Sequence, residues 1–77
     1  MRADTFDATI QQFQQRVPYR PFTIVLVNGT QFEVDFPTAI TVRDGTGVYV
    51  RPGGIPVIFD HEGVNQIFGD LKPEDAG

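Results

Sequence analysis

The stretch 21–36 constrains this chain most, because it has the pattern of two strands joined by a tight turn. In residues 31–36, polar and apolar residues alternate, and a period of two is typical of a half-buried strand. Residues 22–27 are apolar at nearly every position, which favours a strand covered on both faces. Asn28-Gly29 between two such arms predicts a β-hairpin.

The length of the hairpin loop decides which residues of the two arms face each other. A two-residue loop would place Ile24 opposite Glu33, and so the acidic side of one arm against the most apolar side of the other. A three-residue loop, 27–29, pairs Ile24 with Phe32 and gives Gly29 a left-handed conformation, which favours glycine. Because a shift of one residue exchanges the two faces, burial of apolar side chains favours the three-residue loop.

Length and composition predict one globular domain, since the chain has 77 residues, 40% of them hydrophobic and 21% charged. A core this small rarely supplies more than ~3–5 kcal/mol, and such domains often depend on disulfides, metals or partners. The sequence has no cysteine and one histidine, so self-association is the support we expect. The net charge of −4 disfavours non-specific binding to nucleic acid or to an anionic membrane.

The sequence carries no sign of a membrane or an export segment. No run approaches the ~20 apolar residues of a membrane helix, and the N-terminus lacks the apolar core of a signal peptide. We therefore expect a cytoplasmic protein with no membrane partner.

A helix is expected before the hairpin, because apolar residues recur there at spacings of four, three and four, which places them on one face. These residues are Phe6, Ile10, Phe13 and Val17. Asp4 or Thr5 is the expected N-cap. Asp7 in the first turn and Arg16 in the last would complement the helix dipole, and Pro18 would end the helix.

The opposite face of this helix is rich in glutamine: Gln11, Gln12, Gln14 and Gln15. One interpretation is a solvated polar surface. The other is a glutamine-lined pocket for a nucleobase or a peptide.

Further short strands are expected after the hairpin, at 40–43, 48–51 and 55–59, separated by glycine-containing turns. Pro56 indicates that the last of them is an edge strand. Residues 64–68 would then close the core as a short strand or a single turn.

The expected fold class is mainly β, with an N-terminal α-helix followed by a five-stranded bent antiparallel sheet that forms a small barrel. The domain is expected to span residues 1–69. Residues 70–77 have few apolar side chains and are expected to form a mobile tail.

No combination of residues in this sequence specifies a reaction. Serine and cysteine are absent, His61 has no evident catalytic partner, and the acidic residues of the hairpin lie on an exposed strand face, where nothing separates their pKa values. Asp60-His61-Glu62 has metal-ligating residue types, but adjacent residues of an extended chain point apart. We therefore expect no enzyme activity, no cofactor and no metal.

Three short motifs follow one another in the chain: Arg16-Val17-Pro18, Leu26-Val27-Asn28-Gly29 and Phe59-Asp60-His61. In this order they resemble the Sm-like family, in particular its bacterial branch, the Hfq RNA chaperones. In that branch a helix leads through Arg-Val-Pro into a strand that ends Leu-Val-Asn-Gly, and an aromatic-Lys-His motif follows later. The resemblance covers residues 5–68. It implies an Sm-like or SH3-like barrel that self-associates into a ring and binds single-stranded RNA.

The glutamine-rich helix face and the resemblance together give a set of candidate ligand- or RNA-binding residues, and these are Gln11, Gln14, Gln15, Arg16, Asn28, Asp60 and His61. Asp60 stands where the family has a lysine. Because this difference reverses the charge next to RNA phosphate, we expect RNA binding to be reduced or absent.

A second resemblance rests on residues 20–34, which read Arg-Pro-Phe-x-Ile-x-Leu-x-Asn-Gly-x-x-Phe-x-Val, and on Pro-x-x-Ile-x-Val at 37–42. A group of small bacterial proteins shares both motifs, with Asn or Asp before the glycine. This resemblance implies no particular activity.

The expected function is a non-enzymatic binding and assembly module, a self-associating Sm-like protein whose first partner is itself. Single-stranded RNA, or a protein or peptide, is the expected second partner. Two alternatives stay open: an Hfq-like RNA-binding protein, and a monomeric SH3-like adaptor that binds a peptide at its sheet edge.

Overall fold

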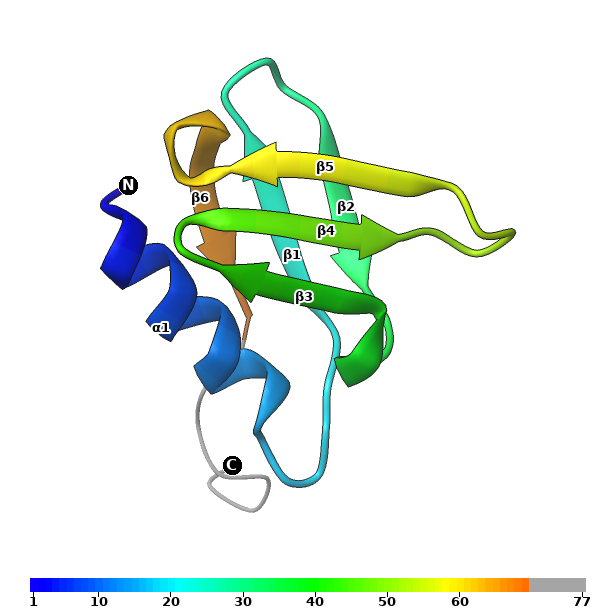
Figure 1. Cartoon of the computed structure of the whole chain (residues 1–77). Helices are drawn as coiled ribbons and strands as arrows, with labels where there is room; N and C mark the ends of the chain where they lie inside the picture. The colour runs from blue at the N-terminus through cyan, green and yellow to red at the C-terminus, as the bar shows by residue number, and fades with distance from the viewer. Residues whose placement is uncertain (70–77) are drawn as a thin grey trace.

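The computed structural model describes residues 1–69 as one α-helix, six strands and two short 3₁₀-helices (Figure 1). The tail predicted for residues 70–77 lies outside the described residues. The elements are α1 (Ala3–Gln14), β1 (Phe22–Leu26), β2 (Gln31–Val34), η1 (Pro37–Ala39), β3 (Ile40–Arg43), β4 (Thr46–Val50), β5 (Pro56–Asp60), η2 (His61–Gly63) and β6 (Val64–Phe68).

The strands form two three-stranded antiparallel sheets, with the orders β2-β1-β6 and β3-β4-β5. In Figure 1 the strands of the second sheet cross in front of those of the first. The predicted mainly β class with an N-terminal helix is confirmed. The predicted count of five strands is wrong, and within residues 1–69 no barrel closes, because β2 does not pair with β3 and β5 does not pair with β6.

The reason for the two sheets lies at the points where the chain changes direction. Pro37, which has no N–H to continue a ladder, starts η1 between β2 and β3. Phe36, which the alternation placed on the apolar side, is therefore 65% exposed. Asp60 caps η2 between β5 and β6, and its side chain accepts a hydrogen bond from the Gly63 N–H at 3.0 Å.

The first hairpin has the predicted three-residue loop. The Leu26 N–H donates to the Thr30 carbonyl at 2.7 Å, and Ile24 lies opposite Phe32. Gly29 has a φ of 91°, as the loop requires. The Asn28 side chain accepts a hydrogen bond from the Thr30 N–H at 2.9 Å, which holds the turn.

The second sheet contains the predicted strands, with shifted bounds for β4 and, by one residue, for β5. β4 begins at Thr46 rather than at residue 48, because Asp44 and Gly45 alone make the turn, with φ values of 52° and 83°. β5 is an edge strand of its sheet, which confirms the interpretation of Pro56.

Helix α1 buries Phe6, Ile10 and Phe13 and packs beside β3 (Figure 1). Its predicted ends are wrong. It begins at Ala3, with Arg2 at the N-cap position, and it ends at Gln14. Val17, the fourth residue of the predicted apolar face, is therefore 94% exposed.

The core lies between the helix and the two sheets. Its buried residues are Phe6, Ile10, Phe13, Phe22, Ile24, Phe32, Val34, Ile40, Tyr49, Phe59 and Val64. Phe59 of β5 makes edge contacts with Phe6 of the helix and Phe32 of β2, at centroid distances of 5.7 and 5.3 Å. Gly47 lies opposite Phe59, and a Cβ at that glycine would lie 2.8 Å from the ring. Glycine at this position therefore lets Phe59 enter the core and fix the position of β5.

Candidate functional site

Within residues 1–69 the two open sheets leave four edge strands, and on two of these edges the chain's own side chains bond an outward-facing carbonyl. On β2, the Glu33 carbonyl accepts a hydrogen bond from the Tyr49 hydroxyl at 2.8 Å. On β3, the Ile40 carbonyl accepts one from Gln14 Nε2 at 2.7 Å, and the same nitrogen donates to the Pro37 carbonyl at 2.8 Å. Side chains of the second sheet and of the helix therefore occupy positions that an added strand would need.

The hydroxyls of Tyr19 and Tyr49 are protonated donors at neutral pH, since the ordinary pKa of tyrosine is 10.0 and their surroundings raise it. Burial raises the pKa of Tyr49, and the nearby Asp35 carboxylate raises it further. Burial also raises the pKa of Tyr19 to about 12, and its hydroxyl donates to the Val34 carbonyl at 2.6 Å. Both hydroxyls thus hold β2 carbonyls across the physiological pH range.

The edge of β5 is open. The Arg51 N–H donates to the Ile55 carbonyl at 2.9 Å, and bonded pairs alternate along an antiparallel ladder. The main-chain groups of the pair Tyr49–Val57 therefore point toward each other, as do those of the pair Gly47–Phe59. The N–H and carbonyl of Ile58, which lies between Val57 and Phe59, face away from β4. Within residues 1–69 no hydrogen bond reaches these two groups, and the Ile58 side chain is 72% exposed.

The edge of β6 is open in the same way. The main-chain N–H of Leu26 bonds toward β2, and successive residues of a strand direct their main-chain groups to opposite sides. The main-chain groups of Thr23 and Val25 therefore face β6, where these residues lie opposite Phe68 and Gln66. The main-chain groups of Ile67, between those two, therefore face away from β1. No hydrogen bond from the described part of the chain reaches them.

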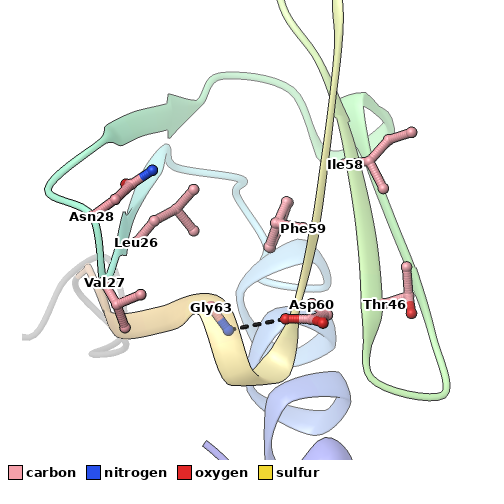
Figure 2. Close-up of a pocket in the computed structure, with 8 residues that line it drawn as sticks. All are labelled: Leu26, Val27, Asn28, Thr46, Ile58, Phe59, Asp60 and Gly63. Atoms are coloured by element: carbon pink, nitrogen blue, oxygen red, sulfur yellow. Dashed lines mark hydrogen bonds between the residues drawn. The ribbon is translucent and has the colours of Figure 1, made fainter.

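A hollow of about 410 Å³ lies between the tip of the first hairpin and the β5 edge (Figure 2). Its lining residues are Leu26, Val27, Asn28, Thr46, Ile58, Phe59, Asp60 and Gly63. Figure 2 shows the hairpin residues on one side of the hollow and β5 on the other. Aliphatic and aromatic side chains supply most of its wall, with a carboxylate, an amide and a hydroxyl at its margin. Its size and composition are those of a pocket for a side chain or a small ligand.

Asp60 is the charged group of this hollow. One of its oxygens accepts the Gly63 N–H, and the residue is exposed to solvent. No cation within residues 1–69 pairs with its carboxylate. The hollow therefore combines an apolar wall with an uncompensated negative charge.

The structure brings together two of the residues that the sequence analysis named for binding, Asn28 and Asp60. His61 does not line the hollow. Its ring Nδ1 lies 2.8 Å from the Met1 carbonyl oxygen, and its main-chain N–H donates to the Gly45 carbonyl at 2.7 Å. These contacts tie η2 to the helix N-terminus and to the β3–β4 turn.

The other named residues lie on or just after the helix. Gln11 and Gln15 are exposed, whereas Gln14 holds the main chain at η1 and β3. Arg16 lies over the Phe13 ring at 5.1 Å and donates to the Arg20 carbonyl at 2.6 Å. A part for these residues in ligand binding stays a prediction.

Sequence reasoning missed Leu26, Ile58 and Phe59 as residues of a site. Pro56 was the available signal, because a proline in a strand indicates an edge, and Ile58 is the next residue whose main-chain groups face the same way.

Residues 1–69 contain no group of three or more His, Cys, Asp or Glu side chains arranged to hold a metal ion. None of their helices has the length and apolar character needed to span a bilayer.

In comparisons with known proteins, no family model, curated protein or solved structure matches this chain.

Proposed function

We propose that this chain is a non-enzymatic assembly module that self-associates by adding the β6 edge of one copy to the β5 edge of the next. The observation that carries the proposal is the state of the four edges. The chain's own side chains bond one outward carbonyl on β2 and one on β3, whereas the main-chain groups of Ile58 and Ile67 are left without partners among the described residues. An unpaired edge is a template for pairing with another chain.

The finer part of the proposal is that the two sheets are the halves of a bent barrel of the Sm-like or SH3-like type. The order of elements supports it, since only residues 35–36 and η1 separate β2 from β3. They then correspond to one strand that bends from the first sheet into the second. Under this interpretation the six strands represent the five that the resemblance implies.

The geometry of the two edges favours head-to-tail association. β5 and β6 belong to different sheets of the same copy, so pairing one with the other leaves a free β5 and a free β6 at the two ends of a dimer. Such a heterologous contact continues until it closes into a ring or extends as a filament. Exposed apolar side chains at the two edges, Ile58 at 72% and Phe68 at 47%, favour burial in such a contact.

The proposal includes weak RNA binding or none. Asp60 places a carboxylate that has no cation partner among residues 1–69 at the margin of the hollow, and the chain carries a net charge of −4. Two unit charges ~4 Å apart repel by ~1 kcal/mol in water and ~4 kcal/mol near a protein surface. This repulsion is comparable to the ~1–3 kcal/mol that stacking on an aromatic side chain gives per base.

The substitution Ile58→Pro tests the proposal. The Ile58 N–H faces away from β4, so proline removes the outward donor without removing a bond of the β4–β5 ladder. β5 already holds Pro56 with the same orientation. We expect light scattering to give several times 8.6 kDa for the wild type and 8.6 kDa for Ile58→Pro.

The matched control is Ile58→Thr, which retains the N–H and a β-branched side chain. It should still self-associate, although more weakly, because it loses apolar surface. Circular dichroism of each variant verifies that the fold persists. A folded Ile58→Pro protein with the mass of the wild-type assembly would show that β5 is not the contact.

A further inference from the structure

We propose that the β5 edge and the hollow beside it also receive a foreign occupant, an extended peptide in which an apolar residue stands next to a lysine or arginine. This inference rests on the proposed function, because it uses the same open edge. It adds the chemistry of a partner and a competition between that partner and self-association.

The arrangement of β5 determines how such a peptide would be bound. A strand that pairs with the main chain of Ile58 has side chains that alternate between the two faces of the extended sheet. On β5, Phe59 points into the core, whereas Ile58 and Asp60, its two neighbours, belong to the opposite face. The peptide therefore places one residue beside Phe59 and the adjacent residue on the side of Asp60.

The inner residue of the peptide enters the hollow. Leu26 and Phe59 supply apolar wall there, with Val27 at the hairpin tip. A space of about 410 Å³ accepts an aliphatic or aromatic side chain. The wall thus favours an apolar residue at this position of the peptide.

The outer residue of the peptide meets Asp60. Cβ atoms of directly opposed residues on paired strands lie ~4.5–5.5 Å apart, so the amine of a lysine or the guanidinium of an arginine can reach the carboxylate. Asp60 Oδ1 already accepts the Gly63 N–H, and its Oδ2 has no partner in the described part of the chain. A cation at this point forms a charge-assisted hydrogen bond with that oxygen.

Charge also distinguishes a foreign peptide from a second copy of the chain. β6, Val64–Phe68, contains no positively charged residue, so a second copy leaves Asp60 uncompensated. Two copies with a net charge of −4 each also repel, whereas a basic peptide is attracted. The β5 edge therefore favours a basic extended peptide over β6 at low protein concentration.

A pair of fluorescein-labelled peptides tests the inference. The first has the sequence Thr-Val-Thr-Val-Lys-Val-Thr-Val, and the second has glutamine in place of lysine. We expect fluorescence anisotropy at low salt to show about fivefold tighter binding of the lysine peptide, the factor that ~1 kcal/mol gives for a partly exposed ion pair.

Two variants show whether Asp60 is the cause of this preference. Asp60→Asn removes the charge but keeps an oxygen that accepts the Gly63 N–H, so it should bind both peptides equally. Glu62→Gln removes the charge of an exposed η2 residue outside the hollow, and it should retain the fivefold preference.

Three results of the binding experiments would overturn the inference. It is wrong if the wild type binds the two peptides equally, if the preference survives in Asp60→Asn, or if neither peptide binds. Light scattering separates this failure from failure of the proposed function: assembly that Ile58→Pro abolishes, without peptide binding, refutes only the peptide. Lysine-dependent binding by a chain that stays monomeric supports the peptide and refutes self-association.

Discussion

The substitution Phe32→Ala should unfold this domain at room temperature. Phe32 is 8% exposed, and it stacks on Tyr49 at a centroid distance of 4.9 Å and contacts the edge of Phe59 at 5.3 Å. Truncation of a buried phenylalanine costs ~3–5 kcal/mol. A single core of this size rarely supplies more than that amount, so little or no free energy of unfolding is left.

Phe36→Ala is the matched control, because the two residues lie on the same side of the alternating sequence pattern. Phe36 is 65% exposed, and its truncation should change the free energy of unfolding by less than ~0.5 kcal/mol. Thermal and urea unfolding followed by circular dichroism measure both variants. The experiments should be done at low protein concentration, because association stabilises the folded state.

Two results would refute this reasoning. One is a Phe32→Ala protein with a cooperative transition near that of the wild type, which would show that Phe32 is not part of the core. The other is an equal loss of stability in Phe36→Ala, which would show that β2 continues past Val34 with its apolar side buried.

Three further predictions concern the turn, the tyrosines and RNA. Gly29→Ala should destabilise the fold by ~1 kcal/mol in urea unfolding through its positive φ alone, because a Cβ there meets nothing within 4 Å; Asn28→Ala should cost less, and equal costs would contradict the bulged loop. Since the pKa of Tyr19 is raised from 10.0 to about 12, its contribution to stability should be full below pH 10 and fall as pH rises toward 12; a Tyr19→Phe protein with the same alkaline decline would refute this assignment. The wild type should bind labelled oligo-uridine no more tightly than ~10⁻⁴–10⁻⁶ M, and Asp60→Lys should bind it more tightly and with a steeper salt dependence; nanomolar binding by the wild type in fluorescence anisotropy would contradict the charge argument.

The sequence was sufficient for features that depend on local chemistry. The hairpin register follows from Asn28-Gly29 together with the side of each arm that must be buried, and the structure has that register. The helix was predicted correctly for Phe6, Ile10 and Phe13. The error at Val17 arose because the helical spacing continues past Gln14, where the structure has already left the helix.

Features that depend on distant contacts could not be predicted in this way. The pairing of β1 with β6 joins segments far apart in the chain, and no local residue pattern specifies it. The hollow requires Leu26 and Phe59 on facing elements, and the bonded Ile40 carbonyl on the edge of β3 depends on Gln14 of the helix. From the sequence alone, a polar residue on a helix is interpreted as solvent-exposed, because the strand that it contacts is not known.

Amide hydrogen exchange of the wild-type chain, followed by NMR at Ile58 and Ile67, tests the central claim most directly. Within a single copy both N–H groups face away from their sheets, so a monomer should exchange them rapidly. Self-association through β5 and β6 predicts that both are protected at high protein concentration and lose protection on dilution, together and with the change in mass. Rapid exchange of both amides in a sample that light scattering shows to be assembled would contradict the account, because the copies would then be in contact through another surface.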